Sequence, residues 1–277
     1  MTYTHILRES AKRFGNITCM GIDPDLDKIP FKEKPREAII RFYSEIFEAM
    51  DSEACHPSAI KPNIAFFEQY GFEGLDALKS IIESAGQYGI PVILDAKRGD
   101  IGKTAVAYAK NIFDFWNADS VTLHPYLGYD SIGPFMEYKN KGAYVQVRNS
   151  NPTAKEIQDL MVDGVPIYMK VAELLLKWDQ AGLGAVVGAT YPDELRKLSK
   201  MFVKSGKEIP MLIPGVGRQG GSATEVMNIL RETENDLAIH RINSSSGISY
   251  AYINTGSDDY AQAAIDALKK LNEETKI

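Results

Sequence analysis

The chain has 277 residues, of which 44% are hydrophobic, with a formal net charge of −6 at pH 7. An acidic chain of ordinary globular composition is poorly suited to general phosphate-backbone binding, so we expect no nucleic-acid partner and only a local basic site. Two cysteines in unrelated contexts, Cys19 and Cys55, and the absence of any apolar run of roughly 20 residues argue against a disulfide framework, a membrane partner and a signal peptide, and favour a soluble cytoplasmic protein.

Eight short runs rich in β-forming residues recur along the chain and are predicted to be strands. They cover residues 17–23, 58–63, 91–97, 119–125, 143–148, 184–189, 210–216 and 238–244. Segments between them place apolar residues at three- and four-residue spacing, which is typical of amphipathic helices. The clearest of these segments are residues 36–50, 74–89, 103–116 and 192–206.

This alternation of strands and helices predicts the fold class. Strands that alternate with helices pair in parallel through right-handed crossovers, and eight such units in a chain of this length predict an α/β fold, a closed (β/α)8 TIM barrel. A doubly wound open sheet is the alternative if one or two strands are misassigned. Because no low-complexity segment or linker interrupts the pattern, we expect residues 1–277 to form a single domain.

Charged side chains gather where the predicted strands end, which in a TIM barrel is the face that carries the active site. The third strand ends with Asp95 and Lys97, followed by Asp100. Because strand side chains alternate, Asp95 and Lys97 point to the same side, as do Lys61 and Asn63 on the second strand. Two lysines and two acids balance their charges without a metal ion. The alternative is an ion-pair network that closes the barrel end and does no chemistry.

Other strand ends also carry polar or glycine-rich sequence. Asp23 follows the first strand, Arg148 and Ser150 follow the fifth, and the run 215-GVGRQGGS-222 follows the seventh. Its glycines free backbone N–H groups to meet an anion, at loops where barrels commonly bind phosphate. The histidines have no partners at ligand spacing, so we expect no metal site.

The run DAKRGDIGKT resembles the signature of the orotidine 5′-phosphate decarboxylase family, with its Asp-x-Lys-x-x-Asp core, and in particular that of the longer-chain bacterial and archaeal branch (type 2). The resemblance covers nearly the whole chain, and its collinear set of motifs is far more specific than the short core alone. The further matching stretches, in order, are GIDPD at 21, IKPN at 60, HPYLGYDS at 124, SNP at 150, VVGATYPDEL at 186, LIPGVGRQGG at 212 and INSSSGI at 242.

The resemblance implies decarboxylation of orotidine 5′-monophosphate to uridine 5′-monophosphate and CO2, without a cofactor, in a homodimer with shared active sites. Asp95 would lie against the substrate carboxylate, and Lys97 would stabilise the carbanion at C6 and protonate it. Lys61 would hold Asp95 and touch the ribose, and Asp100 would reach into the partner's site.

The resemblance also implies a set of substrate-binding residues. Among them, Asp23 would bind a ribose hydroxyl, Ser150 the pyrimidine edge, and Gln219 both phosphate and base. Ile101 and Thr104 would accompany Asp100 into the partner's site. The full set is Asp23, Asn63, Ile101, Thr104, Ser150, Pro214, Arg218, Gln219, Ser246 and Gly247.

The phosphate end departs from the family pattern. The family usually carries an arginine just after the Asn-Ser-Ser of the eighth strand, but this chain has Ser246 there. Arg218, inside the glycine-rich loop, is the candidate replacement, and Arg241 is a weaker one because it lies within the strand itself.

Two other functions stay open. One is a magnesium-dependent sugar-phosphate aldolase or decarboxylase of the same barrel group, which would use an enediolate; the Gln219 loop and the SNP motif at Ser150 favour the nucleotide enzyme. The other is a pyrimidine nucleotide-binding protein without catalysis, suggested by the serine at position 246.

Overall fold

The structure is a computed structural model that describes residues 1–217 and 219–277, and within these residues eight parallel strands form one sheet. The strands are β1 (Thr18–Ile22), β2 (Ala59–Pro62), β3 (Ile93–Arg98), β4 (Ser120–Leu123), β5 (Gly142–Arg148), β8 (Leu183–Val187), β9 (Met211–Pro214) and β10 (Arg241–Ser244). Each overlaps one of the eight predicted strands. Their order is β2-β1-β10-β9-β8-β5-β4-β3, and parallel bridges from Ile60 to Val92 and from Asn63 to Asp95 join the two ends. The predicted TIM barrel is confirmed.

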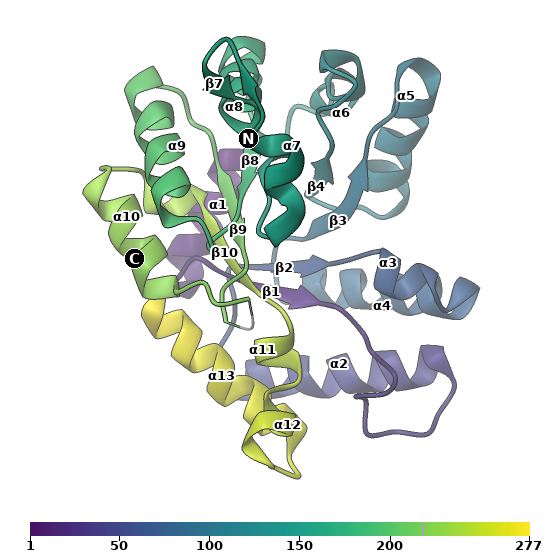
Figure 1. Ribbon diagram of the computed structural model, residues 1–277. Coiled ribbons are helices and arrows are strands. Elements are labelled where there is room, and N and C mark those ends of the chain that lie inside the picture. Colours follow the sequence, from purple (N-terminus) through teal and green to yellow (C-terminus); the bar gives the residue numbers. More distant parts are fainter. Residues whose placement is uncertain (218) are drawn as a thin grey trace.

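Helices surround the strands in Figure 1. The four predicted helical segments correspond to α2 (Pro35–Ser52), α4 (Gly71–Gln87), α9 (Pro192–Ser205), and α5 (Gly102–Lys110), which continues into a π-helical turn at Asn111–Phe115. The remaining helices around the barrel are α3 (Ala65–Glu68), α6 (Gly133–Met136), α8 (Ile167–Trp178), α10 (Ala223–Glu232), α11 (Ser246–Ser249), α12 (Ala251–Thr255) and α13 (Tyr260–Glu274).

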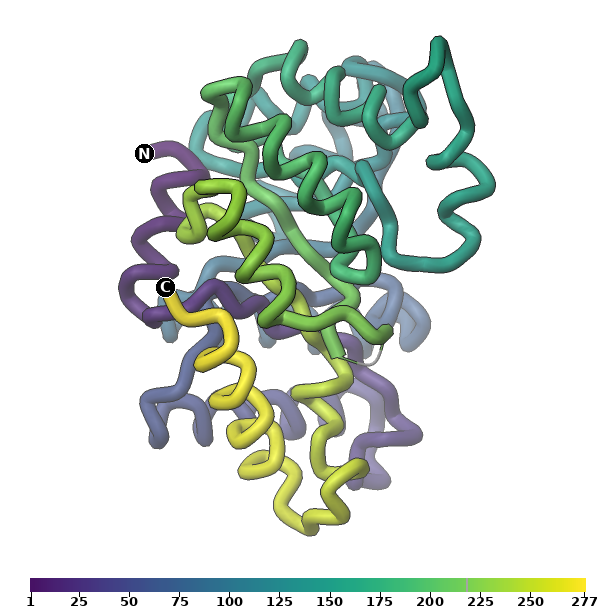
Figure 2. The backbone as a smooth tube through the Cα atoms, turned by 60° about the vertical axis from the view of Figure 1, so that its left-hand side comes forward, coloured from purple at the N-terminus to yellow at the C-terminus, as the bar shows by residue number. Residues whose placement is uncertain are grey.

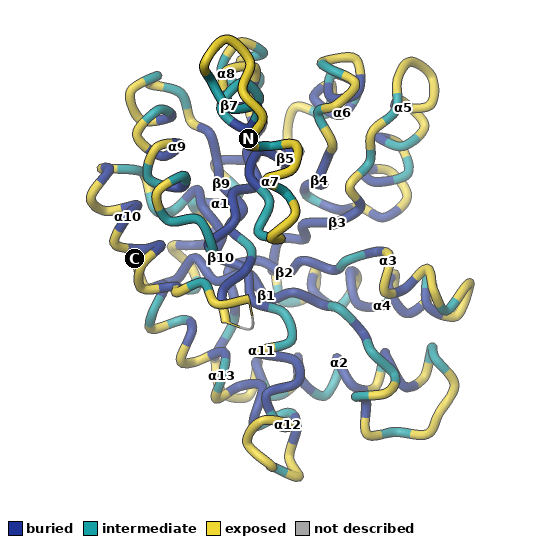
Figure 3. The backbone as a smooth tube through the Cα atoms, in the orientation of Figure 1, coloured by how far each residue is buried: buried dark blue, intermediate teal, exposed yellow. Residues whose placement is uncertain are grey.

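The core lies between the strands and the inner faces of these helices. All five residues of β1 and all seven of β5 are buried, as expected for parallel strands covered on both sides. In Figure 3 the strands are dark blue, whereas the outer faces of the helices are largely yellow. No helix in the described part of the chain is long and apolar enough to span a membrane.

A helix that the sequence analysis did not predict, α1 (Tyr3–Phe14), closes the amino-terminal end of the barrel. Tyr3 and Leu7 are fully buried among residues of six strands. The hydroxyl of Tyr3 lies 2.8 Å from Oγ of Ser120 and donates to the hydroxyl of Tyr144 at 3.1 Å.

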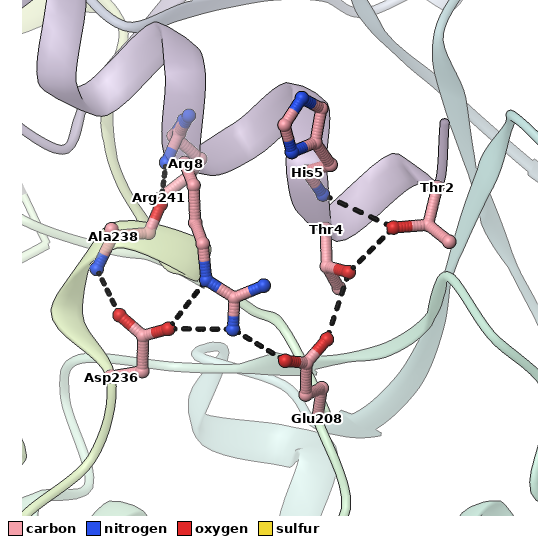
Figure 4. Close-up of polar contacts among 8 residues, drawn as sticks. All are labelled: Thr2, Thr4, His5, Arg8, Glu208, Asp236, Ala238 and Arg241. Carbon is pink, nitrogen blue, oxygen red and sulfur yellow. Dashed lines mark hydrogen bonds and ion pairs between the residues drawn. The ribbon is translucent and has the colours of Figure 1, made fainter.

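Polar contacts tie α1 to the loops beneath the barrel (Figure 4). Arg8 forms ion pairs with Glu208 and Asp236, and Thr4 donates to the same Glu208 at 2.9 Å. The guanidinium of Arg241 donates to the backbone oxygen of Leu7 at 2.7 Å. The guanidinium of Arg241 is therefore hydrogen-bonded at the end of the barrel opposite the carboxyl ends of the strands.

An insertion follows β5 at the carboxyl end of the barrel. It comprises a 3-10 turn (Pro152–Ala154), α7 (Lys155–Gln158) and an antiparallel hairpin of β6 (Met161–Val162) and β7 (Val165–Pro166). The segment, teal to green in Figure 2, stands out from the barrel. The sequence analysis did not predict it, because strands of two residues leave little pattern to recognise.

Candidate active site

A cavity of about 580 Å³ opens at the carboxyl ends of the strands, and most of the predicted site residues line it. These are Asp23, Lys61, Asn63, Asp95, Lys97, Ser150, Pro214, Gln219, Ser246 and Gly247. Lining residues that the sequence analysis did not single out include Phe66, Thr122, Gln146, Asn149, Asn151 and Asn243.

The carboxylate of Asp95 lies at the centre of a charged cluster on β2, β3 and β4. Its Oδ2 accepts from Nζ of Lys61 at 2.9 Å, and its Oδ1 accepts from Nζ of Lys97 at 2.6 Å and from Oγ1 of Thr122 at 2.8 Å. The side chains of Lys61 and Asp95 are 6% and 9% exposed, whereas that of Lys97 is 43% exposed. The Lys97 ammonium is therefore the member of the cluster that is most open to a ligand.

The opposite charges within this cluster outweigh burial in setting the pKa of two members. Burial alone would raise the pKa of Asp95, but the ammonium groups of Lys61 and Lys97 more than offset it and hold that pKa well below its ordinary value. Burial alone would lower the pKa of Lys61, but the charges of Asp95 and Asp23 hold it well above its ordinary value. Asp95 and Lys61 are thus both ionised at neutral pH, before any substrate arrives.

The backbone at Lys97 is unusual. Its φ is 44°, in the left-handed region, which costs a non-glycine residue roughly 1–2 kcal/mol. The register between β3 and β4 shifts between Leu94 and Arg98, and within this bulge the N–H of Lys97 donates to Oγ1 of Thr122 at 3.0 Å. Bulges next to active sites commonly re-aim a side chain, and strained residues of this kind cluster at functional sites.

One wall of the cavity is the segment after β5. The backbone oxygen of Ser150 accepts from Oγ1 of Thr190 at 3.1 Å, and that of Asn151 accepts from the hydroxyl of Tyr191 at 3.3 Å. A Cβ at Gly188 would lie 2.8 Å from Cα of Ser150, so only glycine permits this approach of two strand ends. Residues that follow the neighbouring strand, β8, therefore hold this segment in place.

The base of this segment is held by a buried arginine. Arg148 is 1% exposed and forms ion pairs with Asp159 of the insertion at 2.7 Å and with Glu194 of α9 at 3.6 Å. Its guanidinium also lies 4.0 Å from the ring centroid of Tyr191. Arg148, one of the polar strand ends noted from the sequence, therefore lies behind the cavity wall and not among the residues that line the cavity.

The glycine-rich loop after β9 faces the end of β10. Gly215 and Gly217 have φ values of 100° and 88°, which glycine adopts without strain. A Cβ at Gly21 of β1 would lie 1.8 Å from Oγ of Ser245, so β1 and the loop after β10 also meet closely here. Ser246 and Gly247, at the start of α11, line the cavity next to this contact and form its rim there.

Several buried oxygens of the cavity residues lack a hydrogen-bond partner within the described structure. They are Oδ1 of Asp23, Oδ1 of Asn149 and Oδ1 of Asn243. Native proteins leave few such atoms unpaired, and each needs an explanation. Oxygens that are unpaired at the edge of one cavity indicate a site for a ligand with several hydrogen-bond donors.

Three predicted site residues lie outside the cavity. Asp100 accepts the N–H of the next residue, Ile101, at 2.8 Å, and Ile101 and Thr104 are exposed at the start of α5. Arg218 lies outside the described residues, so its predicted role stays a prediction. Arg241, the weaker candidate for the phosphate, is fully buried against α1 and does not line the cavity; that suggestion was wrong.

The sequence analysis missed Thr122 and Gln146, which are polar residues on inward-facing positions of β4 and β5. Each interrupts an apolar strand pattern, at 120-SVTL-123 and 143-AYVQVR-148, and that interruption was the available signal. No three His, Cys, Asp or Glu side chains in the described part of the chain are grouped so as to hold a metal ion.

Comparisons with known proteins agree with this geometry. A family model described as "Orotidine 5'-phosphate decarboxylase / HUMPS family" matches residues 19–272. The chain is 43% identical over 262 residues to orotidine 5′-phosphate decarboxylase from Herpetosiphon aurantiacus, covering 93% of this chain and 91% of the relative.

Solved structures show the same likeness. The Leishmania donovani OMP decarboxylase aligns with a TM-score of 0.77 at 32% identity, covering 99% of each chain. The L. donovani UMP synthase aligns with a TM-score of 0.79 at 34% identity, covering 99% of this chain but 57% of that one. The chain thus spans little more than half of that longer protein.

Proposed function

The chain belongs to the orotidine 5′-phosphate decarboxylase / HUMPS family, and we propose that the Lys61–Asp95–Lys97 cluster is where it converts orotidine 5′-monophosphate to uridine 5′-monophosphate and CO2. The reaction belongs to pyrimidine biosynthesis. The observation that carries the assignment of the site is a carboxylate held between two ammonium groups, one buried and one open, inside a cavity of about 580 Å³.

The chemistry follows from these charges. A substrate carboxylate placed against Asp95 meets a like charge, which disfavours the bound ground state relative to a transition state that is losing CO2. The bond between C6 and the carboxyl carbon breaks, and its electron pair stays on C6. The ammonium of Lys97 stabilises this carbanion and then gives a proton to C6, after which the neutral amine regains a proton from water.

Lys61 fixes the acid of this pair. The side chain of Lys61 is nearly inaccessible to solvent, and its ammonium donates to Oδ2 of Asp95. The other oxygen of Asp95, Oδ1, is therefore available to accept from Lys97 and Thr122. Preorganised charges of this kind need no rearrangement at the moment of reaction. Because both oxygens of Asp95 accept from donors of the protein, a divalent cation would have to displace an ammonium group, and we propose a reaction without a metal or cofactor.

The phosphate needs a positive charge that the described lining does not provide. Among the described residues around the cavity, the cationic side chains are Lys61 and Lys97, and both are paired with Asp95. The lining near the glycine-rich loop is polar but uncharged: it includes the amide of Gln219 and the hydroxyls of Ser245 and Ser246. The N–H groups of Gly217, Gly220 and Gly221 donate within the loop itself. We propose that Arg218 supplies the missing charge, in place of the arginine that the family carries at the position of Ser246.

Other predicted residues complete the substrate site. The unpaired oxygen of Asp23 suits a ribose hydroxyl, and Ser150 suits the pyrimidine edge. Asn63, Pro214 and Gly247 shape the walls between them.

We also propose a homodimer in which Asp100, Ile101 and Thr104 enter the cavity of the second copy. Ile101 is 52% exposed, and all three residues lie outside their own cavity, so a second subunit is needed to give them a role. Cys19 and Cys55 are both free and buried, which suits the cytoplasmic location that we propose.

One assay tests the proposal. Purified protein is added to orotidine 5′-monophosphate in the presence of a chelator, and loss of the orotate absorbance and release of CO2 are followed. We expect turnover by the wild type and none by Lys97→Ala. Activity that disappears with the chelator would favour the magnesium-dependent enzyme, and binding of uridine 5′-monophosphate without CO2 release would favour a nucleotide-binding protein.

A further inference from the structure

Thr122, which the chemistry above does not use, connects the acid and the base of the cluster. Its Oγ1 lies 2.8 Å from Oδ1 of Asp95 and 3.0 Å from the backbone nitrogen of Lys97. The residue is 1% exposed, so water does not compete for either contact. A hydroxyl has one proton; since the N–H of Lys97 is itself a donor, Thr122 accepts there and gives its own proton to Asp95.

These two contacts act on the geometry of the reaction. The contact with Asp95 fixes the rotation of the carboxylate that Lys97 also approaches, at 2.6 Å. The contact with the Lys97 N–H lies in the bulge where the β3–β4 register shifts and where Lys97 adopts its φ of 44°. A side-chain hydroxyl thus replaces the backbone acceptor of the neighbouring strand at the residue of β3 that has a left-handed φ. This contact holds the backbone of Lys97 in the conformation from which its long side chain reaches the cavity.

We propose that Thr122 is a positioning residue for the decarboxylation, holding the Asp95 carboxylate and the Lys97 backbone so that Nζ of Lys97 stays beside the reacting carbon. The inference rests on the proposed function. It predicts an effect on the chemical step, because the hydroxyl of Thr122 gives its one proton to Asp95 and accepts from Lys97, so that it acts through these two residues and adds little to binding of the ground state.

The test compares three substitutions at this position. Thr122→Val replaces the hydroxyl by a methyl group, and we expect kcat to fall by about 10- to 100-fold, with KM changed by less than about threefold, as for a buried hydrogen bond to a charged group. Thr122→Ser keeps the hydroxyl and should recover kcat to within about threefold of the wild type. If the valine variant does not fold, Thr122→Ala removes the hydroxyl without placing a methyl group against the carboxylate.

Thr18→Val is the matched control. Thr18 is fully buried on β1, and its Oγ1 lies 2.7 Å from Oγ1 of Thr275, away from the cavity. We expect this variant to lose thermal stability, as Thr122→Val does, but to keep its kcat. The comparison separates the loss of a buried hydroxyl from the loss of this particular hydroxyl.

A second readout follows the proton step alone. Uridine 5′-monophosphate is incubated with each variant in D2O, and exchange of the C6 hydrogen is followed by NMR; we expect exchange to slow with Thr122→Val and to recover with Thr122→Ser. The inference is overturned if folded Thr122→Val has the kcat of the wild type, or if Thr122→Ser is as impaired as the valine variant. Failure of the proposed function itself would appear earlier, as a wild type that releases no CO2.

Discussion

Lys61 and Asp95 form an ion pair of 2.9 Å across the line where the barrel closes. Lys61 belongs to β2 and Asp95 to β3, the two ends of the order of hydrogen-bonded strands, and only the isolated bridges Ile60–Val92 and Asn63–Asp95 join them. A pair that belongs to the proposed chemistry therefore also holds the sheet together at its least regular junction.

Removing one member of this pair should therefore affect stability as well as activity. Lys61→Met leaves Asp95 buried with one ammonium fewer, and breaking buried pairs in this way costs about 3–5 kcal/mol. We expect the free energy of unfolding in urea to fall by about this amount and turnover to be lost. Lys269→Met, which breaks a surface pair with Glu53, is the control and should change neither; a Lys61→Met protein as stable as the wild type would contradict the prediction.

The shifted pKa values of the pair predict how stability depends on pH. Asp95 has a lower pKa when folded, so its contribution is complete above its unfolded pKa of about 3.9 and is lost as the pH falls toward the folded value. Lys61 has a higher pKa when folded, so its contribution is complete below its unfolded pKa of about 10.4 and is lost as the pH rises through the folded value.

Urea unfolding between pH 2 and pH 11 measures this dependence. We expect the acid slope to be shallower in the double variant Lys61→Met/Asp95→Asn, because both shifted groups are then absent. An unchanged acid slope would mean that other carboxylates account for acid denaturation.

Substitution of Arg218 should weaken binding of the phosphate. Loss of a charge-assisted contact corresponds to roughly 10- to 150-fold in kcat/KM, mostly through KM. Arg218→Ala and the wild type should process orotidine, which lacks the phosphate, at equal rates. The double variant Arg218→Ala/Ser246→Arg, which places an arginine at the family's usual position, should recover part of the loss. Wild-type kinetics of Arg218→Ala with the nucleotide would remove Arg218 from the site.

The ion pair of Arg148 with Asp159 should hold the insertion near the cavity. In Asp159→Asn the buried guanidinium of Arg148 loses the charge of its nearest partner. An ion pair with one exposed member contributes about 1 kcal/mol, so we expect KM for orotidine 5′-monophosphate to rise roughly fivefold. Hydrogen exchange of residues 150–166 should become faster. Asp193→Asn, which affects a surface pair with Arg196, is the control and should alter neither quantity.

Mixing two inactive variants tests whether the sites are shared. A hybrid of Lys97→Ala and Asp100→Ala subunits contains one site with both wild-type residues and one with neither. Random exchange of subunits makes about half of the dimers hybrid, so about a quarter of the wild-type activity should return. If Asp100 serves its own subunit, no activity will return.

Much of the fold could be predicted because each strand and several helices carry their own local pattern. All eight strands were predicted from short β-rich runs, and ten of the predicted site residues line one cavity because strand ends meet at one face. The helix α1 was missed because its buried residues, such as Tyr3 and Leu7, acquire their environment only once the barrel exists beneath them.

Parts of the site depended on geometry that the sequence does not carry. The role of Thr122 depends on the bulge at Lys97. The left-handed φ at this position could not be predicted, because the residue there is a lysine and not a glycine. For Asp100, the alternating pattern ends at the glycine before it, so the direction of its side chain could not be predicted from strand periodicity. Arg241 looked available from its charge, but three backbone oxygens accept from its guanidinium.

The carboxyl-terminal segment meets the chain between α1 and β1 under the barrel, where Asn16 pairs with Lys276 and the N–H of Ile17 donates to the backbone oxygen of Thr275, and Figure 2 shows the two chain ends on one side of the molecule. A tag, a surface anchor or a second enzyme joined to residue 1 or 277 would leave from the floor of the barrel, opposite the mouth. Such fusions should leave substrate entry unobstructed.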